Sequence, residues 1–256
     1  MEQIFADGNM ADVVRIGERV RKQKSPWWHA TRQVLNHLEQ EGFRWSPRVL
    51  HEDEQFVELS FMPGETIEAS LTGYENPELL VTIGQRVREL HDTLAGFELL
   101  PGTDCVPWPV VTDEHLIVCH NDLSPWNTVM HGSTFKGFID WDLVSVATRE
   151  WDLAWVCWRF APIYPNRDRT GFTARQQADR CRIVLDTYGT DALDLHGFVD
   201  LIDMRMECGL ESVEQLGAQG VHGFDRILAS GMHLSAHDDR RWFNDHRSIF
   251  AEELEP

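Results

Sequence analysis

Residues 118–142 read VCHNDLSPWNTVMHGSTFKGFIDWD, and this stretch decides the fold. It predicts two short strands joined by a turn at Gly132, the first starting at Asn127 and the second ending at Asp140. In an antiparallel hairpin the start of one strand lies beside the end of the next, so we expect these two residues at the same open end. Asp122 lies in the loop that leads into that end. Three oxygen-bearing side chains are therefore expected to converge on one point.

Amide and carboxylate oxygens at one point are the ligands and the proton acceptor that Mg²⁺-dependent phosphate chemistry needs. Residues 120–127 fit the H-x-D-L-x-x-x-N catalytic loop of phosphoryl-transfer enzymes, with Asn121 where protein kinases have Arg. Asp140 closes its strand as the acid of the D-F-G segment does in kinases. Residue frequencies alone would produce the loop motif in roughly a few chains per thousand of this size, so chance is a poor explanation.

Composition sets the class of protein. The chain has 256 residues, of which 42% are hydrophobic and 25% charged, as in ordinary globular proteins. Its net charge of −19 repels nucleic acids and anionic membranes, so we expect neither as a partner. No apolar run approaches the roughly 20 residues of a membrane span, and the N-terminus carries acids where a secretory signal is basic. Five cysteines without C-x-x-C spacing are typical of reduced thiols, so we expect a cytoplasmic protein.

The order of the expected elements predicts an α+β fold with two lobes. Residues 1–63 are expected to form a small antiparallel β-rich lobe with one helix, which begins at Ser25-Pro26. The Pro63-Gly64 pair marks the boundary, and residues 64–256 are expected to form a larger, mostly helical lobe. Ligands usually bind in the cleft between such lobes.

Residues 118–155 resemble the aminoglycoside phosphotransferase and choline kinase family, which has a protein-kinase-like fold, and residues 7–66 resemble it more loosely. The resemblance implies transfer of the γ-phosphoryl group of ATP or GTP to a hydroxyl group of a small molecule, with Mg²⁺. It implies that Asp122 orients the acceptor hydroxyl and accepts its proton. It also implies that Asn127 and Asp140 hold Mg²⁺ beside the nucleotide phosphates.

Three further residues of this region are expected to serve the loop or the metal. His120 is expected to pack and hydrogen-bond, holding the loop, and not to react. Asp152 looks like the acid that braces the loop from a helix start in this family; it is also interpreted as a plain helix N-cap, and the two roles are compatible. Asp142 either assists the metal or faces solvent.

The first lobe is expected to bind the nucleotide. Alternation along the strand puts Val20 and Lys22 on one face, so Lys22 points to the phosphates if Val20 lies against the base. The alternative is that Lys22 belongs to a solvated basic edge. By resemblance, the main chain of Ser60, Phe61 and Met62 binds the adenine edge, with Met62 flanking the base. The alternative is that Phe61 and Met62 are only core residues at a strand end.

Two departures from the family pattern affect the nucleotide side. The helix after the Lys22 strand has no Glu where the partner of the lysine should fall, and Thr31 or Arg32 is near that place. The phosphate loop has no G-x-G-x-x-G, and the sequence offers only Asp7-Gly8-Asn9-Met10-Ala11. These departures favour the competing hypothesis, a non-catalytic nucleotide-binding scaffold with the same fold.

The acceptor is expected to be a small hydroxylated molecule. Residues 1–66 hold eight basic and eleven acidic residues, so −16 of the net charge of −19 lies in the remainder of the chain. This excess is either a solvated surface or an attraction for a cationic acceptor, and an aminoglycoside-like amine is the first candidate. No Ala-Pro-Glu segment follows Asp140, so a protein substrate is not expected.

Overall fold

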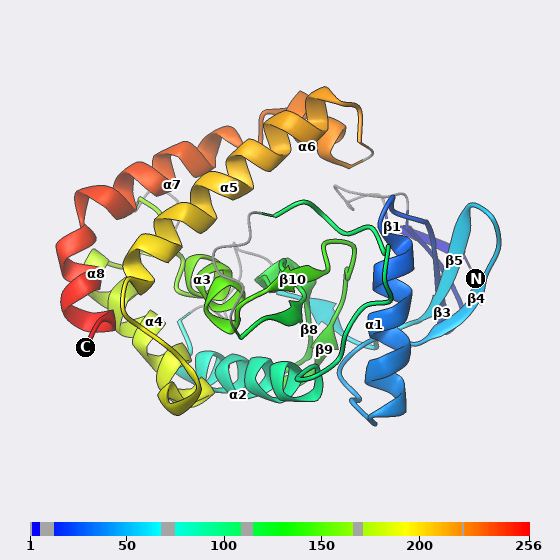
Figure 1. The fold of residues 1–256 in the computed structure, drawn as a ribbon, viewed down its shortest axis with the longest axis horizontal. Helices are drawn as coiled ribbons and strands as arrows, with labels where there is room; N and C mark the ends of the chain where they lie inside the picture. The colour runs from blue at the N-terminus through cyan, green and yellow to red at the C-terminus, as the bar shows by residue number, and fades with distance from the viewer. Residues whose placement is uncertain (1, 6–12, 68–74, 109–114, 166–170, 222) are drawn as a thin grey trace.

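The computed structural model describes residues 2–5, 13–67, 75–108, 115–165, 171–221 and 223–256. It has the α+β architecture that the sequence predicts: a sheet and one helix first, then a mostly helical part (Figure 1). The first sheet lies at one end of the molecule and helices α4, α7 and α8 at the other, with short strands between them (Figure 1).

The described elements have the following bounds. They are β1 (Glu2–Phe5), β2 (Val13–Ile16), β3 (Arg19–Gln23), α1 (Trp28–Gln40), β4 (Val49–Glu52), β5 (Phe56–Ser60), β6 (Glu65–Thr66), α2 (Pro77–Thr93), β7 (Ile117–Cys119), a 3₁₀ turn (Pro125–Asn127), β8 (Thr128–His131), β9 (Thr134–Phe138), β10 (Ser145–Ala147), α3 (Arg149–Phe160), α4 (Ala174–Tyr188), a second 3₁₀ turn (Thr190–Ala192), α5 (Phe198–Ala218), α6 (Phe224–Ser230), α7 (Leu234–Asp245) and α8 (Arg247–Leu254).

The first sheet is antiparallel, with the strand order β1-β2-β3-β5-β4. Helix α1 connects β3 to β4 and buries its apolar stripe, Val34, Leu35 and Leu38, in the main hydrophobic core. The start of α1 differs from the prediction, because its N-cap residue is Trp27. The carbonyl of Ser25, and not its hydroxyl, accepts the N–H of Trp28 at 3.1 Å, so a turn precedes the helix.

Strands β8 and β9 form the expected hairpin, with Thr128 opposite Phe138. Strand β6 pairs with β8, so the residues just after Pro63-Gly64 join the sheet of this hairpin and not the first sheet. Gly137 has φ 153°, and a Cβ atom there would lie 2.6 Å from the carbonyl oxygen of Trp45. The hairpin therefore needs glycine at this position beside its bulge.

The helices enclose the hairpin region. Asn76 caps α2 as its Asn-Pro pair predicts, accepting the N–H of Glu78 at 2.9 Å. Helix α2 packs on α4 and α3 packs on α5, and the tryptophans Trp151 and Trp158 of α3 are buried. Among the described helices, none is both long and apolar enough to cross a membrane.

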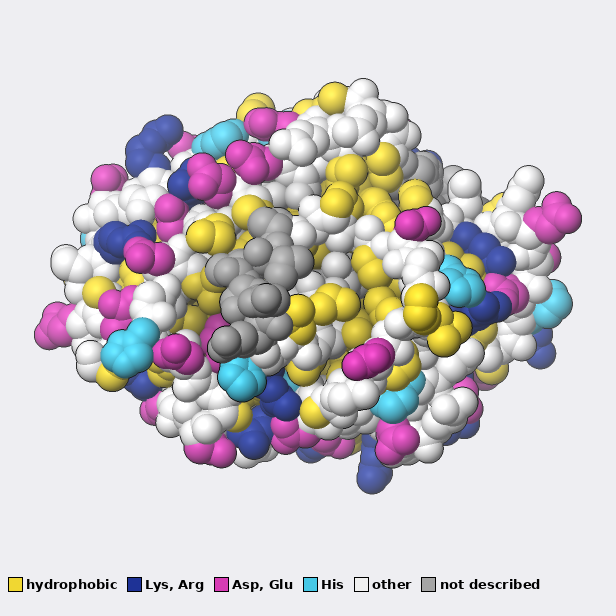
Figure 2. Space-filling view, viewed as in Figure 1, with side chains coloured by type: hydrophobic (Ala, Val, Ile, Leu, Met, Phe, Trp, Pro, Cys, Tyr) yellow, Lys and Arg dark blue, Asp and Glu magenta, His cyan; other side chains and the backbone are white. Residues whose placement is uncertain are grey.

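A second hydrophobic cluster links the start of α1 to α6. The ring of Trp27 meets that of Phe224 edge-on at 6.2 Å, and both contact a cluster that includes Trp108 and Trp151. Figure 2 shows hydrophobic side chains gathered on the face between α6 and α1. The five cysteines are free thiols, as the sequence predicts.

Candidate active site

Asp122 and Asn127 are held together at the two ends of their loop. The Asn127 Nδ2 donates to Asp122 Oδ2 at 2.7 Å and to the Asp122 carbonyl at 3.0 Å. Asn127 is buried and Asp122 is half-buried. Because Nδ2 is engaged by Asp122, Oδ1 is the atom of Asn127 that is left to bind a cation.

Burial and neighbouring charges shift the pKa of the Asp122 carboxyl group. Burial and the nearby charge of Asp140 raise the pKa of Asp122 to about 7, against the opposing charges of Arg159 and Arg205. A carboxylate with a pKa near neutrality accepts a proton more readily than an ordinary aspartate. The position thus suits a group that takes a proton from a hydroxyl.

Asp140 lies at the open end of the hairpin, next to Asn127, as its sequence position predicts. The N–H of Ile139 donates to the carbonyl of Asn127 at 2.9 Å, which brings the start of β8 beside Asp140. Asp140 and Asn121 have φ of 61° and 64°, which is the left-handed backbone conformation that residues other than glycine rarely adopt. Strained backbone of this kind persists only where the surroundings hold it, and it is frequent at functional sites.

His120 holds the loop and links it to the hairpin. Its Nδ1 accepts the N–H of Asp122 at 3.2 Å, so its Nε2 carries the proton and donates to the carbonyl of Ile139 at 3.1 Å. The imidazole is fully buried against the ring of Trp141, and burial lowers the pKa of His120. A neutral imidazole that is hydrogen-bonded through both ring nitrogens supports the loop, as the sequence predicts.

Asp152 braces the loop from the first turn of α3. Its carboxylate accepts the N–H groups of His120 and Asn121 at 3.2 and 3.0 Å. The interpretation as a helix N-cap is wrong, because Thr148 caps α3 by accepting the N–H of Trp151. Although burial opposes it, the hydrogen bond from His91 leaves the pKa of Asp152 below its ordinary value.

Sequence reasoning missed two residues that hold this loop. Arg205 of α5 is fully buried and donates to the carbonyl of Asn121 at 2.7 Å. His91 of α2 donates to Asp152 at 3.2 Å and accepts from the hydroxyl of Tyr188 at 3.0 Å. Neither residue lies in a recognisable motif. The one signal in the sequence is that His91 follows Val87 by four residues, which places it on the apolar face of its helix.

Lys22 points into the site from β3. Its Nζ lies 3.0 Å from Asp140 Oδ1 and 2.7 Å from Asp142 Oδ2, and its side chain is buried, so it does not belong to a solvated edge. Burial lowers the pKa of Lys22, but the two carboxylates more than reverse this and leave it above its ordinary value. Asp142 is buried as well, which excludes the alternative that it faces solvent.

In the segment 60–62, which is expected to bind the adenine edge, only part of the main chain is free for such contacts. The N–H of Ser60 donates to the carbonyl of Arg48, and the N–H of Phe61 donates to that of Glu18, both at 2.9 Å. Among the described residues, the N–H of Met62 has no such partner. The candidate phosphate loop, residues 7–11, lies outside the described residues.

The donor set at the hairpin end fits a hard divalent cation. Asn127 supplies an amide oxygen, and Asp140 a carboxylate whose pKa the charge of Lys22 holds below its ordinary value against the effect of burial. Such oxygen ligands suit Mg²⁺. The described chain has another potential ligand group in His91, Cys119 and Asp152. Burial keeps the pKa of the Cys119 thiol high, and His91 and Asp152 are hydrogen-bonded to each other. We therefore interpret this group as structural.

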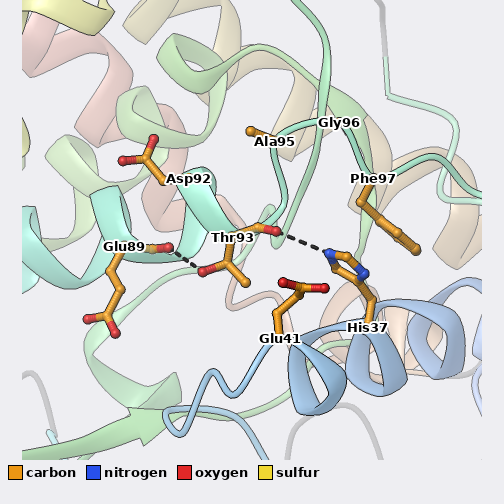
Figure 3. Close-up of a pocket in the computed structure, with 8 residues that line it drawn as sticks. All are labelled: His37, Glu41, Glu89, Asp92, Thr93, Ala95, Gly96 and Phe97. Atoms are coloured by element: carbon orange, nitrogen blue, oxygen red, sulfur yellow. Dashed lines mark hydrogen bonds between the residues drawn. The ribbon is translucent and has the colours of Figure 1, made fainter.

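A hollow between the ends of α1 and α2 is separate from the candidate site (Figure 3). His37 bonds to the carbonyl of Thr93 across it at 3.1 Å (Figure 3). Two of its three acids are in ion pairs: Glu89 with Arg86, and Asp92 with Arg88 of α2 and Arg149 of α3. The hollow is lined by His37, Glu41, Glu89, Asp92, Thr93, Ala95, Gly96 and Phe97.

Comparison with known proteins identifies the family of this chain. The model of the phosphotransferase enzyme family matches residues 103–189. The trifolitoxin immunity protein of Rhizobium leguminosarum bv. trifolii is 31% identical over 208 residues, which are 78% of this chain and 78% of that protein.

Solved kinase structures share the fold over nearly the whole chain. A microcompartment-associated aminopropanol kinase matches with a TM-score of 0.64 at 11% identity, covering 100% of this chain and 94% of that one. An aminoglycoside 2′-phosphotransferase in complex with GDP matches with a TM-score of 0.63 at 13% identity, covering 97% and 93%. The two-lobe kinase-like fold expected from the sequence is confirmed.

Proposed function

Because the chain belongs to the phosphotransferase enzyme family, we propose that it transfers the γ-phosphoryl group of ATP or GTP to a hydroxyl group of a small molecule, with Mg²⁺. The observation that carries this proposal is the meeting of Asp122, Asn127 and Asp140 at one end of the β8–β9 hairpin. A protein that only binds nucleotide has no need of a proton acceptor at this place.

Asp122 is the proposed catalytic residue. Asn127 orients the Asp122 carboxylate through Oδ2, and Oδ1 accepts the proton of the acceptor hydroxyl. The new P–O bond forms as the bond between the γ-phosphorus and the departing nucleoside diphosphate breaks. The transition state of phosphoryl transfer is loose, so holding the hydroxyl in line with the γ-phosphate matters more than strong basicity. The fixed loop geometry supplies that positioning.

Asn127, Asp140 and Lys22 are the residues that would hold the nucleotide phosphates and their cation. When bound, Mg²⁺ would neutralise charge on the phosphate oxygens. Asn127 would contribute its amide oxygen and Asp140 its carboxylate, while the ammonium group of Lys22 would face the phosphates. The main chain around Met62 is the proposed contact for the base.

The acceptor would bind against Trp126. This ring lies four residues after Asp122 and is 41% exposed, with the guanidinium of Arg159 5.3 Å from its centroid. An aromatic face stacks on sugar rings and attracts ammonium groups. Together with the acidic charge of residues 67–256, this keeps an aminoglycoside-like amine as the first candidate acceptor.

The name of the 31% identical relative adds a second candidate acceptor, a toxin with a hydroxyl group. Phosphorylation replaces a neutral hydroxyl by a group of charge near −2, which disrupts contacts that the unmodified molecule makes. Trifolitoxin itself is therefore one member of the acceptor panel below.

The experiment is transfer of radiolabelled γ-phosphate from ATP or GTP, with Mg²⁺, to a panel of amino alcohols, aminoglycosides and trifolitoxin. We expect labelled product with at least one acceptor, and loss of about 10³-fold in turnover for Asp122→Asn with nucleotide affinity nearly unchanged. Asp140→Asn should weaken Mg²⁺-dependent nucleotide binding as well.

The competing scaffold hypothesis predicts a different outcome. It was favoured by the missing helix glutamate, although the structure gives Lys22 another carboxylate partner in Asp142. Nucleotide binding without transfer to any acceptor of the panel would favour the scaffold. Asp122→Asn turning over as fast as the parent would refute the role of Asp122.

A further inference from the structure

The buried carboxylate that pairs with Lys22 belongs to the loop after β9 and not to α1. Helix α1 (Trp28–Gln40) contains one acid, Glu39, which lies in its last turn and pairs with Arg48 at 3.5 Å. Asp142 lies 2.7 Å from Lys22, across 120 residues of sequence. In protein kinases the equivalent lysine pairs with a helix glutamate, and this pair must be in place for activity.

The two carboxylates at Lys22 are not equivalent. The Asp142 side chain is 8% exposed and approaches Nζ to 2.7 Å, whereas the Asp140 side chain is 30% exposed and lies at 3.0 Å. The more exposed group can exchange lysine for another cation with less loss of protein contacts. The more buried and closer group is the one that retains the lysine.

We propose that Asp142 is a positioning residue that keeps the ammonium group of Lys22 beside the nucleotide phosphates while Asp140 is engaged by Mg²⁺. The inference rests on the proposed function, because it assigns Lys22 to the phosphates and Asp140 to the cation. Asp142, an acid of the loop after β9, would thus position the lysine as a helix glutamate does in protein kinases.

The same loop also anchors α1. The hydroxyl of Thr31 donates to the carbonyl of Trp141 at 2.8 Å, and both groups are buried. Three successive residues, 140–142, thus bind β3 and α1 of the first lobe. The position of the Lys22 ammonium group therefore depends on this loop and not on an ion pair with α1.

Removal of the Asp142 charge has a consequence at the metal site. With Asn at this position, Lys22 keeps one carboxylate partner, Asp140, and competes with Mg²⁺ for it. Asp142→Asn should therefore raise both the nucleotide concentration and the Mg²⁺ concentration needed for half-saturation, each by about tenfold, which is the loss of one charge-assisted hydrogen bond. Turnover at saturating nucleotide and Mg²⁺ should fall much less.

The test is calorimetric titration of the full chain with ATP and GTP at several Mg²⁺ concentrations. The variants are Asp142→Asn, Asp142→Glu and Lys22→Met, with Glu39→Gln as the matched control on α1. We expect weakened nucleotide binding for Asp142→Asn, partial recovery for Asp142→Glu, and parental binding for Glu39→Gln. The double variant Lys22→Met/Asp142→Asn should bind no more weakly than Lys22→Met alone, because both changes break the same pair.

Three results would overturn the inference: parental nucleotide and Mg²⁺ affinities in Asp142→Asn, additive effects in the double variant, or weakening by Glu39→Gln. Thermal unfolding of Asp142→Asn tests whether the change acts through folding. Binding does not require an acceptor, so failure to find phosphoryl transfer leaves this test intact. A parent chain that binds neither nucleotide with Mg²⁺ would refute both the proposed function and this inference.

Discussion

The loop 120–127 and the neighbouring strands β3 and β5 of the first sheet are held in opposite ways. Around Asn121 the loop is bonded to buried groups: its N–H to Asp152, its carbonyl to Arg205 and its side chain to three main-chain carbonyls. On the first sheet, surface ion pairs such as Arg19–Glu58 tie β3 to the neighbouring β5.

This difference has an energetic meaning. A buried donor or acceptor that loses its partner costs about 1–3 kcal/mol, whereas an exposed ion pair contributes about 0–1 kcal/mol. The loop can therefore hold Asn121 and Asp140 in left-handed conformations, which the sheet pairs could not enforce. The strained backbone of the candidate site is thus found where the hydrogen bonds are buried.

Asp152→Ala should have the largest effect on stability of the substitutions that test this difference. Three donors, the N–H groups of His120 and Asn121 and the ring of His91, would lose their acceptor together. We expect the free energy of unfolding in urea to fall by about 3–5 kcal/mol. Asp152→Asn, which keeps one acceptor oxygen, should lose less, and a loss below about 1 kcal/mol for Asp152→Ala would show that the loop is held otherwise.

Trp126→Ala tests the exposed face of the same loop. The ring is 41% exposed and stacks near Arg159, so its removal should leave the fold intact and cost acceptor binding about tenfold. The measurement is the KM for the acceptor found by the transfer assay, with the KM for nucleotide as the internal control. Equal changes in both constants would mean that Trp126 acts on the loop and not on the acceptor.

Glu58→Gln should have the smallest effect. Glu58 pairs with Arg19 at 3.0 Å and Arg21 at 3.5 Å on the first sheet, where Arg19 is exposed and Arg21 is half-buried. We expect little or no change of the free energy of unfolding in urea, and any loss should shrink when salt is raised, because surface ion pairs are screened. A loss as large as that of Asp152→Ala would remove the contrast between the two regions.

Much of the candidate site could be predicted because it lies within one local stretch. The hairpin that brings Asn127 near Asp140 is specified by strand–turn–strand order, and the face of Lys22 by alternation along β3. Both follow from backbone periodicity, which neighbouring residues impose on one another. The roles of these residues in phosphoryl transfer stay predictions for the assays above.

Other features depended on contacts between distant segments. Strand β10 has three residues, too few to show alternation, and exists because it pairs with β7. The start of α1 was misplaced because a turn at Ser25 competes with the cap that its side chain could form. Arg205 carries no motif, and only the packing of α5 against α3 brings it to the loop.

The amino-acid sequence by itself determined the α+β order, the β8–β9 hairpin and the acids at its end, because each follows from spacing within a few residues. Only the tertiary structure decided that Lys22 pairs with Asp142, and that Asp152 and Arg205 bind one residue from two sides. Those choices depend on how separate elements pack, since burial makes an ion pair or hydrogen bond strong only where several segments exclude water together.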